Sequence, residues 1–243
     1  IQKQGFFNRI GSTIDYIIWG SVKWLTFTGI IKLFITFEGG EGSGKTTQIE
    51  LLSDYLLSKS HNVFVTREPG GSKGAESIRN LLVTGNPERW SVKTEALLMY
   101  ASRLDNYERL IKPNLNQGKI VISDRFADST RVYQGFVGGV SEREIEELHS
   151  FCLNNFDPDL TFILDIDVKQ GLLRAKSRNN NENRFESKGL KFHELVRKGY
   201  LILADKNKRM HVIDASMSIS EINNNIVQIV ETYLNDNNKW MKI

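Results

Sequence analysis

The chain has 243 residues, 40% of them hydrophobic and 25% charged, which is typical of a folded globular protein and excludes a disordered chain. Its one cysteine, Cys152, excludes an intrachain disulfide, and its four histidines lack the spacing of a zinc site, so we expect a reducing, cytoplasmic setting. The length fits one large α/β domain and also permits two small ones.

The net charge of +3 is too small to indicate a nucleic-acid-binding protein, but the cations are unevenly distributed. Residues 169–209 contain 12 Lys or Arg against 4 Asp or Glu. A basic stretch of this kind can bind nucleic acid, form a solvated helix face or close over a polyphosphate. The motifs elsewhere in the chain have to decide between these alternatives.

The first 32 residues are rich in apolar and aromatic side chains and precede every motif. Their spacing suits one face of a helix, at Ile14, Ile17, Ile18, Val22 and Leu25. Charged residues and glycines interrupt the longest apolar stretch, so it is a poor transmembrane span, and no cleavage site of a signal peptide follows it. We expect residues 1–32 to be an amphipathic appendage of unknown role, packed on the domain or on a partner subunit. Docking on a membrane surface is the alternative, without stable insertion.

From residue 33 onward, strand and helix patterns alternate without a linker or an internal repeat. Apolar runs predict strands at residues 33–38, 62–66, 119–123, 160–165 and 210–213. Helices are predicted at residues 45–57, 75–82, 94–111, 141–154, 168–177 and 192–206, followed by a last helix capped by Ser218 and Glu221. Ser141 and Glu144 also have the spacing of a capping box. This order predicts one α/β domain, residues 33–243, with a five-stranded parallel sheet and helices on both faces.

Between the first strand and the first helix, residues 39–46 fit the phosphate-loop pattern G-x-x-x-x-G-K-[ST] in the context that this pattern requires. Glycines let backbone N–H groups turn toward phosphate oxygens, and the following helix adds the positive end of its dipole. We expect Lys45 to reach the β and γ phosphates of ATP, and the Thr46 hydroxyl to bind Mg²⁺. The residues predicted to bind ATP are Gly39, Gly40, Glu41, Gly42, Ser43, Gly44, Lys45, Thr46 and Thr47.

A second polar pair follows the apolar strand at residues 119–123. Asp124 is placed to hold Mg²⁺, directly or through water, and Arg125 to bind phosphate oxygens. An Asp-Arg surface pair at a strand end is the alternative. Ligands of open α/β sheets gather beyond the carboxyl ends of the strands, where the phosphate loop also lies, and this favours ligand binding.

Three further motifs resemble those of bacterial thymidylate kinases: T-R-E-P-G-G at residues 66–71, D-R-F-A-D-S-T at residues 124–130 and Y-Q-G at residues 133–135. The resemblance covers residues 33–233. It implies a P-loop kinase fold with a short arginine-bearing lid at about residues 178–188. It also implies transfer of the γ-phosphate of ATP to dTMP, giving dTDP and ADP in dTTP biosynthesis, by a homodimer that uses Mg²⁺.

The resemblance also implies roles for individual residues. Arg79 and Arg103 match arginines that contact dTMP, and Arg125 would hold its phosphate. Tyr133 matches an aromatic residue that crowds the 2′ position of the sugar and so disfavours ribonucleotides. The remaining matches are Thr130 and Gln134 near the thymine base, Glu41 near the 3′-hydroxyl and Glu68 beside the acceptor phosphate.

At the position where the family commonly stacks Phe on thymine, this chain has Met99, followed by Tyr100. Met can cover an aromatic ring softly, and a shift of one residue would bring Tyr100 into the site instead. The residue that covers the base, and with it the discrimination between dTMP and dUMP, therefore stays open.

Some members of the family carry an arginine in the phosphate loop, where this chain has Glu41 followed by Gly42 and Ser43. Phosphoryl transfer relies on cations around the transferring group, so this cation must come from elsewhere. Residues 178–185 are polar and Asn-rich and lie between two predicted helices, which suits a lid. We predict that Arg178, Arg184 or both act as catalytic residues together with Lys45 and Arg125, with Arg174 as a further candidate.

Two other functions fit part of the pattern. Another P-loop nucleotide or deoxynucleoside kinase would use the same scaffold on a different acceptor. A noncatalytic nucleotide-binding module, whose basic segment contacts nucleic acid, would not require the motifs after the phosphate loop. We therefore expect ATP and dTMP as ligands, and no nucleic acid.

Overall fold

The computed structural model describes residues 9–10, 13–14, 32–86, 88–176, 184–185 and 188–239. Its central sheet has five parallel strands in the order β4-β5-β3-β6-β7. The strands are β3 (Leu33–Glu38), β4 (Val63–Arg67), β5 (Ile120–Asp124), β6 (Leu160–Asp165) and β7 (Met210–Asp214). The five-stranded parallel sheet is thus confirmed, and each predicted strand end lies within one residue of the observed end.

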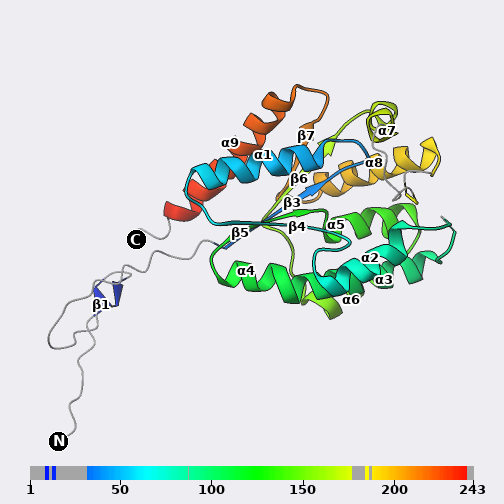
Figure 1. The fold of residues 1–243 in the computed structure, drawn as a ribbon, viewed down its shortest axis with the longest axis horizontal. Helices are drawn as coiled ribbons and strands as arrows, with labels where there is room; N and C mark the ends of the chain where they lie inside the picture. Colours follow the sequence, from blue (N-terminus) through cyan, green and yellow to red (C-terminus); the bar gives the residue numbers. More distant parts are fainter. Residues whose placement is uncertain are drawn as a thin grey trace, which may run out of the picture.

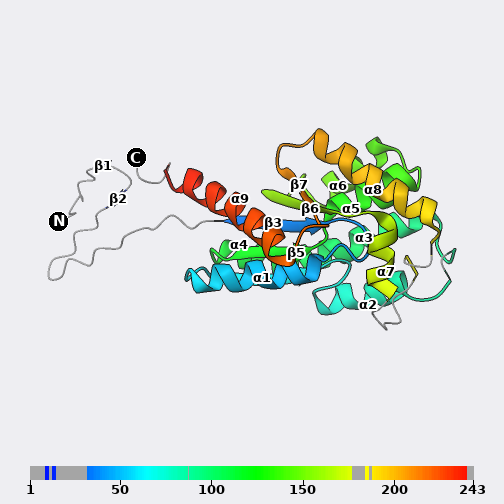
Figure 2. The same cartoon turned by 90° about the horizontal axis from the view of Figure 1, so that it is seen from above.

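Helices cover both faces of the sheet (Figures 1 and 2). α1 (Lys45–Ser58) and α9 (Ile219–Lys239) pack on one face, and α3 (Val92–Asn106), α4 (Lys112–Asn116) and α6 (Glu142–Leu153) pack on the other. The further helices are α2 (Lys73–Val83), α5 (Ala127–Thr130), α7 (Val168–Lys176), α8 (Leu190–Asp205) and two π-helices, η1 (Tyr107–Ile111) and η2 (Arg131–Val137).

The central strand β3 is buried along its whole length. Leu33, Ile35 and Phe37 pack in a cluster with α1 and α9, whereas Phe34 packs in a second cluster with α3, α4 and α6. Successive side chains of a strand point to opposite faces, so a strand that is covered on both sides reads as a continuous apolar run. Glu38 ends this run, and its buried side chain lies at the carboxyl end of the central strand, next to the phosphate loop.

The observed helices differ from the predicted helices in the regions of the two π-helices. The helix predicted at residues 94–111 is α3 followed by η1, and the helical path continues through α4 to Asn116. The turns α5 and η2 were not predicted, although η2 carries Tyr133 and Gln134. π-helices are rare and are frequently found at functional sites.

Both predicted capping boxes are confirmed. The Ser141 hydroxyl accepts a hydrogen bond from the Glu144 N–H, and the Glu144 carboxylate accepts one from the Ser141 N–H at 3.2 Å. The same exchange joins Ser218 and Glu221, at 3.0 and 3.3 Å. These short-range signals therefore mark the starts of α6 and α9 correctly.

The predicted amphipathic appendage of residues 1–32 lies outside the described residues, apart from Lys32 and two short antiparallel strands, β1 (Arg9–Ile10) and β2 (Thr13–Ile14). Ile14, which the predicted helical face includes, belongs to β2. No helix in the described part of the chain is both long enough and apolar enough to span a bilayer.

Candidate active site

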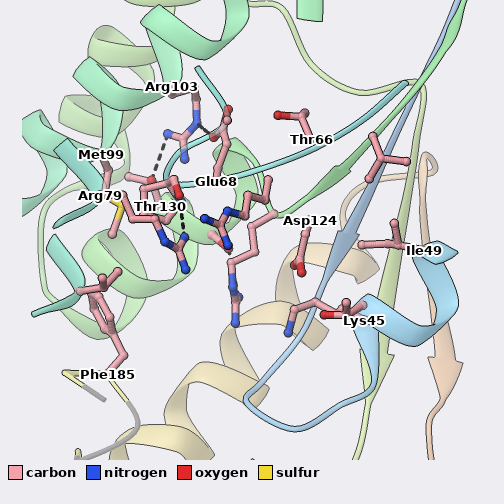
Figure 3. Close-up of a pocket in the computed structure, with 18 of the residues that line it drawn as sticks. Lys45, Ile49, Thr66, Glu68, Arg79, Met99, Arg103, Asp124, Thr130 and Phe185 are labelled. Atoms are coloured by element: carbon pink, nitrogen blue, oxygen red, sulfur yellow. Dashed lines mark hydrogen bonds and ion pairs between the residues drawn. The ribbon is translucent and has the colours of Figure 1, made fainter. Parts of the chain in front are cut away.

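A cavity of about 650 Å³ opens beyond the carboxyl ends of β3, β4 and β5. Lys45 and Asp124 lie at one end of it, and Met99, Thr130 and Phe185 lie at the other (Figure 3). All the residues predicted to bind dTMP line this cavity: Glu41, Glu68, Arg79, Met99, Arg103, Arg125, Thr130, Tyr133 and Gln134. Of the residues predicted to bind ATP, the lining includes Glu41, Gly42, Ser43, Gly44, Lys45 and Thr46.

The phosphate loop packs closely against α7 and β6. Gly42 has a φ of +67°, and a Cβ there would lie 1.9 Å from the Gly171 carbonyl oxygen in α7. Gly39 has a φ of +133°, and its Cβ would lie 2.6 Å from the Leu164 carbonyl oxygen. Only glycine fits such close backbone approaches, so these two positions explain part of the loop's composition.

Lys45 is buried and folds back over its own loop. Its Nζ donates hydrogen bonds to the carbonyl oxygens of Gly40, at 3.1 Å, and of Gly39, at 3.4 Å. Burial lowers the pKa of Lys45, and the nearby Arg125 lowers it further. The ammonium group is thus held at the cavity wall by weak acceptors.

Arg125 has the left-handed backbone conformation, with a φ of 69°, which is uncommon for a residue other than glycine. Its N–H donates to the Phe37 carbonyl at 2.9 Å, and its carbonyl accepts from the Ser123 hydroxyl at 2.7 Å. The surrounding structure therefore holds a strained residue in place, as is typical of functional sites.

The guanidinium of Arg125 points into the cavity and bonds to several partners. Its Nη2 donates to Glu41 Oε1 at 3.0 Å, and its Nη1 donates to Ser129 and to Tyr200 at 3.2 and 3.1 Å. Burial alone would raise the pKa of Glu41, but Arg125 and Lys45 together lower it. Glu41 is therefore an ionised acid that faces two cations at the mouth of the phosphate loop.

Glu38 is fully buried behind this arginine. Its carboxylate accepts hydrogen bonds from the Phe126 N–H at 2.8 Å, the Ser129 hydroxyl at 2.6 Å and the Tyr200 hydroxyl at 2.8 Å. Arg125 lies 4.0 Å away. Burial raises the pKa of Glu38 to about 7. Glu38 thus joins the end of β3 to the turn that carries Arg125.

Arg103 and Glu68 form a buried ion pair on the wall of the cavity. Arg103 Nε donates to Glu68 Oε2 at 2.7 Å, and its two terminal nitrogens donate to the Thr130 hydroxyl and the Phe126 carbonyl, both at 3.0 Å. Burial raises the pKa of Glu68, and the charge of Arg103 opposes the shift. Truncating one partner of such a pair leaves a buried unpaired charge, which is strongly destabilising.

Met99, and not Tyr100, faces the cavity. Tyr100 is fully buried in the cluster beneath α3, where the Arg103 guanidinium lies 4.7 Å from the centre of its ring. The one-residue shift that the sequence left open is thus absent from the structure. Arg79 lines the same part of the cavity and donates to the Pro69 carbonyl at 2.6 Å.

The structure describes two of the arginines predicted to contact the γ-phosphate, Arg184 and Arg174. Arg178 lies outside the described residues. Arg184 is buried, and its Nη1 lies 2.5 Å from Glu95 Oε2 on α3, with further bonds to the Leu82 and Asn86 carbonyls. It is absent from the residues that line the cavity, whereas its neighbour Phe185 is present. Arg174, on α7, donates to the Ala215 carbonyl at 3.3 Å.

Thr46 and Asp124 offer a hydroxyl and a carboxylate beside Lys45. These are hard oxygen ligands of the kind that Mg²⁺ prefers, and Mg²⁺ usually completes its shell with water and phosphate oxygens. No group of three or more His, Cys, Asp or Glu side chains in the described residues could hold a metal alone. Thr46 and Asp124 therefore fit a Mg²⁺ ion whose other ligands are phosphate oxygens and water.

Comparison with known proteins agrees with this geometry. The family model for thymidylate kinase matches residues 37–226. A thymidylate kinase from Caulobacter vibrioides is 52% identical over 198 residues, which are 81% of this chain and 95% of the relative. One from Ruegeria pomeroyi is 46% identical over 204 residues, with coverages of 84% and 96%. The chain belongs to the thymidylate kinase family. A crystal structure of thymidylate kinase from Ehrlichia chaffeensis matches with a TM-score of 0.65 and 37% identity, over 82% of this chain and 98% of that one.

The motifs of the thymidylate kinase family led to the lining residues, but they did not indicate what holds these residues in place. Glu38, Tyr200 and Glu95 were missed. Glu38 left a signal in the sequence, because it is an acid that ends an apolar strand directly before the phosphate loop. Glu95 and Tyr200 lie on helices, and no motif separates them from ordinary helical residues.

The buried Glu38 predicts a pH-dependent stability. The pKa of its carboxyl is raised from 4.5 to about 7, so between these values the folded state holds a proton that the unfolded state releases. The contribution of this group is fully present below pH 4.5 and is lost as the pH rises to about 7, a change of ~3 kcal/mol. Glu38→Gln removes this titration. Urea unfolding should therefore show the variant gaining stability relative to wild type as the pH rises from 4.5 to about 8. A difference that does not vary with pH would contradict the assignment.

Proposed function

We propose that ATP and dTMP bind head to head in this cavity, and that Lys45 and the arginines around it carry out the transfer of the γ-phosphate. The chain catalyses the reaction of its family, the ATP-dependent phosphorylation of dTMP to dTDP. The observation that carries the proposal is the shared cavity: the phosphate loop, Arg79, Arg103 and Arg125 all line it. Phosphoryl transfer needs little covalent chemistry from a protein, so catalysis comes from in-line positioning and from cations near the transferring group.

On the ATP side, we assign the phosphates to the loop at residues 39–47. Backbone N–H groups and the start of α1 favour negative charge there, and Lys45 exchanges its carbonyl partners for the β and γ phosphate oxygens. Thr46 and Asp124 would hold Mg²⁺, and the metal would supply positive charge that neutralises the phosphates during transfer.

On the dTMP side, we assign the acceptor phosphate to Arg125, with Arg103 and Glu68 beside it. Glu41 lies near the sugar 3′-hydroxyl, and Tyr133 fills the space that a 2′-hydroxyl would need. The base lies between Met99, Arg79, Thr130 and Gln134. Met99 faces the cavity whereas Tyr100 is buried, which supports the proposal that the thioether of Met99 packs on the ring of the base.

An acceptor panel tests the assignment. In a coupled assay with ATP and Mg²⁺, turnover should be greatest with dTMP, lower with dUMP and dCMP, and lowest with thymidine, which lacks the phosphate that Arg125 would bind. Chelating Mg²⁺ should abolish turnover, because the phosphate charges are then not neutralised. Fastest turnover with thymidine would refute a monophosphate acceptor.

The arginines of the lid have separable roles in this proposal. We assign the contact with the γ-phosphate to Arg178, because Arg184 reaches it only if its bonds to Glu95 and two carbonyls break. Arg178→Ala should lower kcat by a factor of ~10³, as loss of an arginine finger does, and Arg184→Ala and Arg174→Ala should lower it less. Lys169→Ala, an exposed cation on α7, is the matched control. If the lid variants all keep the wild-type kcat, the phosphate contact lies elsewhere.

We also propose a homodimer, formed through the surface where α3 and α6 lie together. Lys93 on α3 and Glu144 on α6 form an ion pair at 2.5 Å, and Leu97 and Phe151 are further along these helices. Both are unusually exposed for their type, at 59% and 85%. A large exposed apolar patch marks an interaction site, and we propose that these two side chains belong to one.

A single charge should split this dimer. Phe151→Glu places a carboxylate at the proposed interface, so light scattering should shift from the mass of a dimer toward that of a monomer. Leu57→Glu is the matched control, since Leu57 is 53% exposed on α1, which covers the opposite face of the sheet. A monomeric wild type, or an unchanged mass for the Phe151 variant, would contradict this interface.

A further inference from the structure

The side-chain amide of Gln134 is hydrogen-bonded to a buried carboxylate next to the cavity. Gln134 Nε2 donates a hydrogen bond to Glu95 Oε1 at 2.7 Å. Gln134 is 1% exposed and Glu95 is 5% exposed, yet Gln134 also lines the cavity near Met99 and Thr130. This bond therefore joins a wall residue of the base site to a buried residue behind it.

Arg184 holds the other oxygen of the same carboxylate. Its Nη1 lies 2.5 Å from Glu95 Oε2, and the guanidinium also bonds to the carbonyls of Leu82 and Asn86. Both side chains of this ion pair are buried. A carboxylate that is paired with arginine accepts hydrogen bonds and donates none.

This arrangement decides which end of the Gln134 amide is available to a ligand. The nitrogen must face Glu95, because the carbonyl oxygen would meet a negative charge there. No described residue donates a hydrogen bond to Gln134 Oε1. An amide in the opposite orientation would offer two donors to the cavity, whereas this one offers an acceptor.

We propose that Glu95 is a positioning residue that makes the site selective for pyrimidines whose N3 carries a hydrogen. Glu95 acts by holding the Gln134 carbonyl toward the base. This inference rests on the proposed position of the base between Met99 and Gln134. Thymine and uracil present an N3–H donor, which pairs with this carbonyl. Cytosine presents a lone pair at N3, so the two acceptors repel each other and one buried group is left unpaired.

The test replaces the carboxylate by its isosteric amide. In Glu95→Gln the new side chain can donate as well as accept, so the Gln134 amide is free to invert. We expect the ratio of kcat/KM for dTMP over dCMP to fall at least about tenfold, the effect of one misplaced hydrogen bond. The ratio for dTMP over dUMP should stay unchanged, because these two bases have the same groups at N3 and O4. A general disturbance of the site would not separate the two ratios in this way.

Three controls show whether Glu95 acts through Gln134. Glu95→Asp keeps an acceptor-only group and should keep most of the preference. Adding Glu95→Gln to Gln134→Ala should change the dTMP over dCMP ratio no further, since coupled residues are not additive. Glu146→Gln removes a carboxylate paired with Arg131, which does not line the cavity, and should leave the ratio at the wild-type value.

The outcomes separate this inference from the proposed function. If wild type phosphorylates none of the three monophosphates, the proposed function fails. If wild type prefers dTMP and Glu95→Gln keeps that preference over dCMP, the role of Glu95 is refuted. Should Glu95→Gln not fold, Gln134→Ala decides: a wild-type ratio in that variant would also overturn the inference, because Gln134 would then not read the base.

Discussion

A buried carboxylate joins the two sides of the cavity. Glu38 ends β3 directly before the phosphate loop and accepts hydrogen bonds from the Phe126 N–H and the Ser129 hydroxyl, beyond the end of β5. Leaving these groups unpaired in the interior would be costly, so the bonds fix the turn after β5 against β3. Arg125 lies in this turn with a left-handed backbone, which local preference alone would not select. The phosphate loop and the arginine opposite it are therefore parts of one rigid unit.

Two cations of the site, Arg103 and Arg125, are held in place by the protein itself. Arg103 is bonded to Glu68 and Arg125 to Glu41, so each charge has a carboxylate partner in the interior. Their mutual repulsion is reduced in this way, and their directions are set by the protein. Groups that are oriented in advance need little reorganisation when charge develops on a transferring phosphate. Glu68 and Glu41 thus pair with the arginines and orient them, which accounts for carboxylates in a cavity proposed to bind anions.

The sequence was most informative where one local rule decides the outcome. Strands covered on both sides appear as apolar runs, and the phosphate loop has a fixed pattern, so both were predicted. Other features depend on distant contacts. Met99 and Tyr100 are neighbours on a helix, about 100° apart, and only the packing beneath α3 decides which of them faces the cavity. Arg184 pairs with Glu95, which lies far earlier in the chain, and nothing near Arg184 indicates that partner. The π-helix η2 differs from an α-helix by its hydrogen-bond register, which composition does not record.

In the proposed arrangement, the partners of Lys45 and Arg125 set different conditions for the binding of the two phosphates. Lys45 contacts carbonyl oxygens at 3.1 and 3.4 Å, and a charged phosphate oxygen is a stronger acceptor than either, so this exchange costs little. Arg125 is bonded to Glu41 at 3.0 Å, and a phosphate that arrives there meets a carboxylate of the same sign. The guanidinium can bind both only by dividing its donors between them, or Glu41 must turn toward another partner. In the proposed arrangement, the acceptor phosphate would therefore compete with an internal acid, whereas the donor phosphates would displace only weak backbone contacts. The two halves of the cavity would then select their ligands by different means.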